Sequence, residues 1–371
     1  MARMNRSCLY PVKRGVVLCT VVLLVTSLAA ARQQVPPADP LALATEHLYS
    51  LEYDSALALL GPYVVENPND LRALNLLAAT LLRQEMFRQG LLEVNQYGDE
   101  GDVYKPQKMP LPPGFEQQLM SALDRVQTIT SERLKADPQD REALYWAGVA
   151  SGTRSLYLFT LKRSYMGALR ESKNAAKLHR ELLKLEPQNR DALLVLGVQD
   201  YVLGSLPWPI KILVALTGAG GDKKRGIQQL ERCAAQGHFA RQDARFVLPV
   251  LYMREKRSTD ALETLQSLAA NYPRNYLLLQ EIASVQRVQK NWRGALETYE
   301  SLLARHRAGV AGYRRIPLSR VLYLAGHSAV QIGENERALR YYEQASQLTP
   351  DVYASRAQAA AADLLKRMRR G

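Results

Sequence analysis

The sequence predicts an all-α protein that folds as a solenoid of antiparallel helix hairpins. The first observation is the stretch 322–350, which has the pattern of two short amphipathic helices joined at Gly333-Glu334-Asn335. The second is that the same order of small and large residues recurs beside several prolines. The third is that no stretch alternates apolar and polar residues with a period of two, and an aromatic content of 7% is low for a strand-rich protein.

The contact residues of the stretch 322–350 follow helical spacing, with Leu322, Ala325 and Gly326 on the first helix and Ala338, Tyr342 and Ala345 on the second. Gly326 and Ala338 would let the two backbones approach closely, while Tyr342 fills the neighbouring gap. Pro350 cannot continue a helix, so the second helix should end there. We expect each such hairpin to bury its apolar stripe against the next one.

The recurrence is seen by counting from the other prolines. Ala56, Leu60 and Tyr63 precede Pro68, and Val126 and Thr130 precede Pro138. Ala175, His179 and Leu182 precede Pro187, and Ala261, Leu265 and Leu268 precede Pro273. Leu74 and Leu77-Ala78 follow Pro68, and Leu144 and Ala147-Gly148 follow Pro138. Leu193 and Leu196-Gly197 follow Pro187, and Leu279 and Ile282-Ala283 follow Pro273. A further unit, 282–302, carries Ala295 and Tyr299 and lacks only its terminal proline.

This order of an apolar residue, a small pair, an alanine, an aromatic residue and a proline resembles the tetratricopeptide repeat (TPR). The resemblance implies stacked hairpins whose inner, concave surface recognises a protein or peptide. We expect residues 41–350 to form the array and residues 351–371 to form a polar-faced helix that covers its last apolar surface. The basic end of that helix, 366–370, favours a solvated cap, with contact to lipid or a partner as the alternative.

Residues 1–31 have the pattern of a secretory signal peptide, with a basic start, an apolar run at 15–28 and a small-residue cleavage site at Ala29-Ala30-Ala31. The prediction is export to the periplasm or cell envelope, and the alternative is an uncleaved N-terminal membrane anchor. Residues 32–40 form a Pro-rich lead-in. Of the three cysteines, Cys233 alone follows the leader, and we expect it to be buried in a repeat helix rather than reactive.

Two parts of the array depart from the regular repeat. Residues 97–115 are rich in Gly, Pro and charge, which predicts a surface loop that is either a simple insertion or a flap over the groove. Pro187 follows Pro138 by 49 residues, against about 34 in the standard repeat, so that hairpin should have longer helices. Its extra turns carry Arg154, Tyr157, Lys162, Arg163 and Tyr165. Either the tyrosines pack the extra turns and the basic side chains are solvated, or the set binds an anionic or peptide partner.

Residues 204–220 form an insertion that is apolar almost all round, so it should be buried in the solenoid or contact a partner protein or lipid. Residues 196–235, read as GxLPxPxKxLxxLxGxxGDxxxG, resemble a motif of the TPR family that includes a yeast inclusion-body clearance protein of the outer mitochondrial membrane. This chain differs from that family in its leader and in the regular repeats around the motif, so the resemblance implies only a shared structural element. After the insertion, Gly226, Leu230 and Cys233 are expected at small, large and small contact positions.

No catalytic, cofactor-binding or metal-binding residues are expected. The five histidines are scattered without metal-ligand spacing, no GxSxG element occurs, and GAGGDKKRG lacks the GxxxxGK[ST] order of a phosphate-binding loop. The array leaves no length for a catalytic domain, so the chain is not expected to be an enzyme. The net charge of +13 favours anionic surfaces, although nucleic acid is not expected as the partner of an exported protein.

The first helices of the repeats should line the inner surface, and the face opposite their core stripe is the candidate binding surface. Its candidate residues are Asn75, Tyr145, Tyr201, Phe246, Arg254, Arg287, Tyr323 and His327. The mixture suits an extended or helical peptide with an acidic element, or another subunit, because arginines form directional hydrogen bonds to carboxylates.

The predicted function is therefore an exported scaffold for protein–protein interaction in the cell envelope. The alternative is a membrane-proximal assembly or trafficking adaptor that contacts lipid through residues 204–220 or the basic C-terminal helix. The sequence does not predict an oligomeric state.

Overall fold

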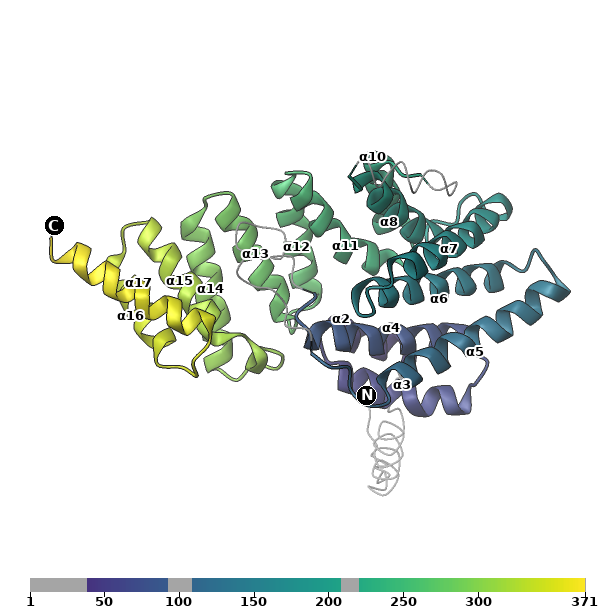
Figure 1. Ribbon diagram of the computed structural model, residues 1–371, viewed down its shortest axis with the longest axis horizontal. Helices are drawn as coiled ribbons and strands as arrows, with labels where there is room; N and C mark the ends of the chain where they lie inside the picture. The colour runs from purple at the N-terminus through teal and green to yellow at the C-terminus, as the bar shows by residue number, and fades with distance from the viewer. Residues whose placement is uncertain (1–38, 93–108, 208–219, 371) are drawn as a thin grey trace, which may run out of the picture. The chain divides into compact units, whose positions relative to one another are not determined.

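The computed structural model describes residues 39–92, 109–207 and 220–370, and Figure 1 shows the order of their helices. These residues form fifteen α-helices and one short 3-10 helix and include no β-strand, which confirms the all-α prediction. The predicted signal peptide lies outside the described residues, as do most of the lead-in, most of the 97–115 loop and most of the apolar insertion.

The helices follow one another as antiparallel hairpins, and each packs on the helices before and after it in the chain. The hairpins are α2 (Pro40–Tyr49) with α3 (Tyr53–Glu66), α4 (Leu71–Arg88) with α5 (Phe115–Ala136), α6 (Arg141–Thr160) with α7 (Tyr165–Leu185), α8 (Ala192–Ser205) with α10 (Lys223–Gln236), α11 (Arg241–Arg254) with α12 (Ser258–Asn271), α13 (Tyr276–Val288) with α14 (Trp292–Arg307), and α15 (Leu318–Gln331) with α16 (Asn335–Ser346). A 3-10 turn, η2 (Tyr313–Arg315), precedes α15, and α17 (Val352–Met368) packs on α15 and α16. This stacking in chain order is the predicted solenoid of helix hairpins.

Side-chain caps set where several of the first helices begin. The carboxylates of Asp70 and Asp140 accept hydrogen bonds from the N–H groups of Ala73 and Ala143, at 2.9 and 3.0 Å. Each aspartate lies two residues after a proline of the repeat pattern. Because proline ends the preceding helix and the aspartate satisfies free N–H groups of the next one, the turn between hairpins is defined locally.

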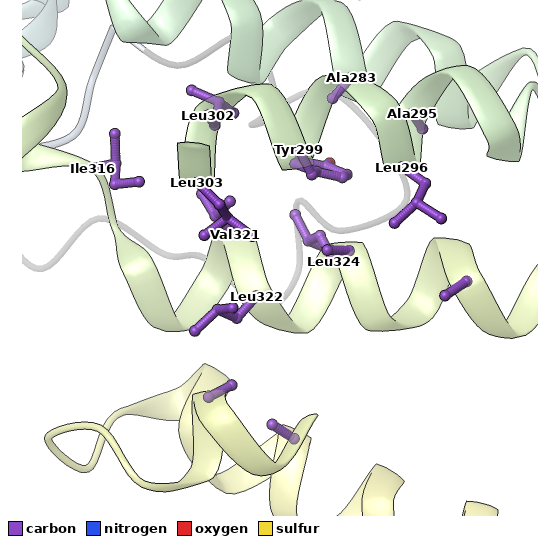
Figure 2. Close-up of a cluster of buried hydrophobic side chains, with 14 of the residues drawn as sticks. Ala283, Ala295, Leu296, Tyr299, Leu302, Leu303, Ile316, Val321, Leu322 and Leu324 are labelled. Atoms are coloured by element: carbon purple, nitrogen blue, oxygen red, sulfur yellow. The ribbon is translucent and has the colours of Figure 1, made fainter. Parts of the chain in front are cut away.

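The core of the last hairpins shows how neighbouring repeats are held together (Figure 2). Tyr299 of α14 is completely buried in a cluster that also contains Ala283 of α13 and Leu324 of α15. In the next hairpin, a methyl group at Gly326 would lie only 2.7 Å from Cε1 of Tyr342 and 3.2 Å from the carbonyl oxygen of Ala338. The close approach predicted for Gly326 and Tyr342 is therefore present.

The hairpin α8–α10 uses the same principle with two glycines. A methyl group at Gly226 would lie 2.7 Å from the carbonyl oxygen of Gly197 and 2.7 Å from the backbone nitrogen of Tyr201. Leu230 and Cys233 follow on the same face of α10 and are completely buried. This confirms the predicted small, large and small contacts. Burial also raises the pKa of the Cys233 thiol to about 12, so the thiol stays protonated and unreactive at neutral pH.

The long repeat interval appears as two long helices. α6 and α7 contain 20 and 21 residues, whereas α15 and α16 contain 14 and 12. Tyr165 is exposed near the end of the added turns, whereas Tyr157 is only 1% exposed and packs in the core, as one of the two predicted alternatives has it. The predicted 97–115 loop ends one residue early, because Phe115 is buried and begins α5.

Candidate partner-binding surface

Three of the predicted partner-binding residues are buried inside the repeat array. Asn75, Tyr145 and Tyr201 are 2%, 7% and 1% exposed. The amide nitrogen of Asn75 donates to the carbonyl of Leu71 at 2.8 Å, and the hydroxyl of Tyr201 donates to Glu255 at 2.9 Å. These side chains stabilise the fold, so a partner could not contact them without opening the helices.

Tyr145 packs on a histidine that the sequence pattern places at an aromatic position. Its ring stacks on the ring of His179 with a centroid distance of 5.6 Å, and His179 is completely buried. Gly148 makes the space, because a methyl group there would lie 2.1 Å from Cδ2 of the imidazole. Each ring nitrogen of His179 lies 3.2 Å from a backbone carbonyl, those of Ala192 and Tyr145. A neutral imidazole carries one N–H and can donate to only one of them.

Burial lowers the pKa of His179 below its ordinary value of 6.5, against the opposing influence of the two carbonyls and of Asp191. The neutral ring is therefore the favoured form in the folded protein. His179 serves as a packed core residue with two backbone contacts. Among the described residues, no group of three or more His, Cys, Asp and Glu side chains is arranged to hold a metal ion.

Phe246 lies on the predicted face of α11, where a residue of the first hairpin covers it. The ring of Tyr49, at the end of α2, stacks on Phe246 with a centroid distance of 5.1 Å and an interplanar angle of 10°. The hydroxyl of Tyr49 donates to Asp243 of α11 at 2.7 Å. The same aspartate pairs with Arg83 of α4, and that guanidinium lies over the ring of Tyr49 at 5.4 Å. We call the set Tyr49, Arg83, Asp243 and Phe246 the closing contact.

The electrostatics of the closing contact favour the charged pair. Burial alone would lower the pKa of Arg83, but Asp243 and Tyr49 raise it above its ordinary value. Burial and the neighbouring carboxylate of Asp243 raise the pKa of Tyr49 well above its ordinary range. The tyrosine therefore stays protonated and can donate its hydrogen bond at any physiological pH.

A second set of contacts ties α2 to the start of α13. Arg274 lies 3.0 Å from the carboxylate of Glu46 and 3.1 Å from that of Glu52. The side chain of Asn275 donates to the carbonyl of Tyr49 at 2.8 Å. The N-terminal hairpin thus packs across α11 and α13, which come about two hundred residues later in the chain. No sequence pattern predicted these contacts, because the residues that make them occupy no common position of the repeat.

A cleft of about 210 Å³ lies beside these contacts. It is lined by side chains of both charges and two aromatic rings: Glu52, Asp54, Phe87, Tyr276, Arg314 and Arg315 are among them. Arg315 is 3.7 Å from Asp54 across this cleft. Because acids and bases balance there, the cleft does not select a ligand by charge.

The remaining predicted residues lie on three successive first helices and are not buried. Arg254 ends α11 and is exposed, while Arg287 of α13 and Tyr323 and His327 of α15 are half-buried. The ring of Tyr323 lies between those of Tyr342 and Tyr353, each at 5.8 Å, and the ring of His327 meets that of Trp292 edge-on at 5.6 Å. These four residues, which we call the inner C-terminal surface, are the part of the predicted surface that a partner can reach.

In the described segments of the chain, none of the helices has both the length and the apolar run that a membrane crossing requires.

No protein-family model matches the sequence, and the comparison with curated proteins finds no match. Among solved structures, PilW, a widely conserved type IV pilus biogenesis factor, is 13% identical, with a TM-score of 0.38 over 62% of this chain and 88% of that one. TTC0263, a TPR protein of Thermus thermophilus, is 21% identical, with a TM-score of 0.35 over 66% of this chain and 96% of that one. Human IFIT1, in a structure of its dimer with PPP-AAAA, is 15% identical, with a TM-score of 0.33 over 87% of this chain and 71% of that one.

These likenesses extend to the arrangement of helices alone. The chain's own features are the proline-anchored recurrence, the close contacts of Gly326 and Gly226 and the stacking of hairpins in chain order. By these features the protein is a TPR-like α-solenoid.

Proposed function

We propose that this chain, a repeat scaffold of the kind that binds other proteins, is exported and holds a protein or peptide partner on its inner C-terminal surface in the cell envelope. One observation carries the proposal. The inner positions of the early repeats, such as Tyr145 and Tyr201, are buried, and Phe246 is covered by Tyr49. Arg254, Arg287 and His327 remain accessible on α11, α13 and α15.

The chemistry of this surface indicates the kind of partner. The surface carries two guanidinium groups, on α11 and α13, and on α15 the ring of Tyr323 and the imidazole of His327, which meets the ring of Trp292. Arginine binds carboxylates through paired hydrogen bonds, and tyrosine and tryptophan contribute apolar contact at little entropic cost. The partner we propose is a segment that carries an acidic side chain or a free C-terminus beside an apolar residue.

Site-specific crosslinking tests this proposal. A photoreactive amino acid is placed in turn at Arg254, Arg287 and His327, and at Glu263 on the exposed side of α12 as a control. We expect the three inner positions to capture one and the same protein from an envelope extract, identified by mass spectrometry, and the control position to miss it. Capture at Glu263 alone would move the binding surface to the other side of the array.

Charge reversal measures the contribution of the arginines. The double variant Arg254→Glu and Arg287→Glu should weaken binding of the captured partner by roughly tenfold or more, since charged hydrogen bonds at an interface are typically worth 2 kcal/mol or more. The variant Arg369→Glu and Arg370→Glu makes the same change of charge at the exposed end of the chain and should leave the affinity unchanged. Equal affinity in both variants would contradict the proposed surface.

Export has its own test, because it rests on the predicted leader. Cleavage after Ala31 would give a mature chain that begins at Arg32, and N-terminal sequencing of the protein from the envelope fraction would show it. A chain that keeps Met1 and sediments with membranes would instead support the uncleaved anchor.

A second candidate function is the membrane-proximal adaptor. It is favoured by the end of α17, where Leu365 and Met368 are exposed among the basic residues of 366–370. An apolar stripe beside lysines and arginines is typical of helices that lie on anionic lipid. Flotation with lipid vesicles should then be lost in Leu365→Ser with Met368→Ser, or in Trp208→Ser with Ile212→Ser for the apolar insertion.

A further inference from the structure

Because successive helices are antiparallel, the described residues that join the two helices of a hairpin lie on one edge of the array, and the turns between hairpins lie on the other. Contacts between successive turns show that they adjoin. Lys223, at the start of α10, pairs with Glu255, at the end of α11, at 2.8 Å. Gln289, after α13, donates to the hydroxyl of Ser258, at the start of α12, at 3.2 Å.

Four of these turns, together with the first residues of the helices that follow them, are basic: 161–164, 220–225, 255–257 and 289–293. Their basic residues are Lys162, Arg163, Lys223, Lys224, Arg225, Lys256, Arg257, Lys290 and Arg293, and their only acids are Asp222 and Glu255. We call this set the basic turn edge. Five of these cations pair with carboxylates: Lys162 with Glu116, Lys223 with Glu255, Arg225 with Asp200, Arg257 with Asp260 and Arg293 with Glu334. The opposite edge lacks such an excess, since its turn at 186–191 contains two acids and one arginine.

Three residues of the basic turn edge have a backbone conformation that favours glycine. Arg163, Lys256 and Lys290 have φ values of 54°, 59° and 58°, in the left-handed region at the ends of α6, α11 and α13. The equivalent turns after α4 and α15 use Gly90 and Gly333 there, with φ values of 68° and 81°. A side chain in this conformation costs free energy that glycine would avoid. At three turns the chain nevertheless carries a long cation.

These cations point into solvent without an acidic partner. Arg163, Lys256 and Lys290 are exposed, and no carboxylate in the described part of the chain pairs with any of the three. A positive charge at a helix C-terminus is favourable, but the macrodipole contributes less than the left-handed conformation costs. Leu51 has the same conformation after α2, with a φ value of 63°, so the conformation alone does not select a cation. The exposure of three cations that no carboxylate neutralises is what favours an anionic partner.

The longest hairpin adds an apolar tip to this edge. Phe159, Tyr165 and Met166 are 53%, 61% and 73% exposed, and the two rings meet edge-on at 5.7 Å. They flank the turn that carries Lys162 and Arg163. A protein surface rarely leaves three large apolar side chains together in water unless they meet a partner.

We propose that the basic turn edge and the tip of α6–α7 bind the surface of an anionic lipid bilayer. The tip favours lipid, because Phe159, Tyr165 and Met166 are all exposed at the end of the α6–α7 hairpin, beside Lys162 and Arg163. Aromatic rings beside lysine and arginine are the composition of protein segments that sit at the membrane–water interface. Anionic headgroups complement the unpaired cations of several successive turns at once.

This edge borders the inner C-terminal surface, because Arg254 directly precedes the turn at 255–257 and His327 contacts Trp292 of the turn at 289–293. The lipid proposal is therefore tested with residues outside the four of the inner C-terminal surface. Binding would be peripheral.

Vesicle flotation tests the proposal with the chain that follows the predicted leader, residues 32–371, which contains the whole compact unit Pro40–Gly371. The probes are phosphatidylcholine vesicles with and without one third phosphatidylglycerol. We expect binding to the anionic vesicles only, weakened by added salt because headgroup attraction is screened. Equal binding to both kinds of vesicle, or binding to neither, would overturn the proposal.

Two sets of variants locate the binding. The tip variant changes Phe159, Tyr165 and Met166 to Ser, and the turn variant changes Arg163, Lys256 and Lys290 to Gly. Each should reduce binding to anionic vesicles by roughly tenfold or more, since three cations near the headgroups, or three apolar side chains inserted among them, are lost at once. Glycine suits the left-handed conformation, so the turn variant should unfold at the same or a higher temperature, and lost binding would not reflect lost structure.

Matched controls exclude other surfaces. Val65→Ser removes a side chain that is 78% exposed on the opposite edge, and Lys135→Ser with Lys184→Ser removes two exposed cations near the ends of α5 and α7 on that edge. Both should bind vesicles like the parent. Loss in Arg369→Ser with Arg370→Ser, with retention in the tip and turn variants, would assign lipid binding to the C-terminal helix and refute the proposed edge. Tight binding of single-stranded RNA that is lost only in the turn variant, without vesicle binding, would assign the edge to nucleic acid and refute it as well.

Discussion

The hairpin α15–α16 and the closing contact differ in how far apart their partners lie in the chain. Gly326 meets Tyr342, a residue in the next helix. Tyr49 meets Asp243, which is 194 residues away. The hairpin is held by small and aromatic residues at helical spacing, whereas the closing contact is held by an ion pair, a hydroxyl and a stacked ring. Repeat spacing therefore predicts which helices pair, but not which repeats meet again later in the chain.

The largest effect is expected inside the regular hairpin. Gly326→Ala places a methyl group 2.7 Å from the buried ring of Tyr342, so the ring and α16 must shift, at a cost of about 3 kcal/mol in unfolding free energy. Gly61→Ala is the matched control, because a methyl group there would meet nothing within 4 Å. In that half-buried helix position with open space around it, alanine should stabilise by up to ~1 kcal/mol. Chemical denaturation compares the two, and equal stabilities would contradict the close approach.

The next effect is expected in the closing contact. Asp243→Ala removes the acceptor of both Tyr49 and Arg83 and leaves the guanidinium without its carboxylate, which should cost about 2 kcal/mol, since both groups keep some solvent contact. Asp363→Ala breaks an exposed ion pair with Arg367 in α17 and should cost only about 0.5 kcal/mol. The measurement is again unfolding free energy. A cost of Asp243→Ala no larger than that of the control would show that the first hairpin is held by other contacts.

A smaller, pH-dependent effect is expected at His179. Its folded-state pKa is lowered, so below pH 6.5 the unfolded chain takes up a proton that the folded protein refuses. Stability should therefore fall as pH decreases from 6.5 toward the folded pKa, by at most ~1.4 kcal/mol per pH unit from this residue. His179→Gln should be less stable at neutral pH, but its unfolding free energy should depend less on pH below 6.5 than that of the parent. Parallel stability curves for the two proteins between pH 7 and 5 would contradict this.

The smallest effect is a stabilisation. Lys290→Gly should raise the unfolding free energy by roughly 0.5–1 kcal/mol, because glycine adopts the left-handed backbone at the end of α13 without steric cost. Lys290→Ala keeps a Cβ in that conformation and should not gain this stability. Thermal unfolding of the two variants beside the parent gives the comparison. A gain in Lys290→Ala as large as in Lys290→Gly would show that the left-handed conformation of Lys290 is not strained.

Most of the fold was predictable because it is encoded over short distances. The prolines, the capping aspartates and the spacing of Gly326 and Tyr342 act within one or two helices, and the sequence shows them directly. For Tyr157 and Tyr165 the sequence left both packing and exposure open, because tyrosines in extra turns have no regular repeat position, and the structure buries the first and exposes the second.

The candidate site was less predictable for a different reason. Counting along a helix identifies its inner face, and Arg254, Arg287, Tyr323 and His327 were found in this way. It does not show what covers that face. Phe246 is covered by Tyr49 of a distant hairpin, and Tyr145 packs on His179, so their inner positions serve the fold instead of a partner.

The separation of Tyr49 from Asp243 also orders events during synthesis. Ribosomes add about 10 residues per second, so the first hairpin would wait on the order of 20 seconds before α11 exists to receive it. During that interval Tyr49 has no ring to stack on and Glu46 has no arginine to meet. The early repeats are therefore the part of the nascent chain that most needs a chaperone.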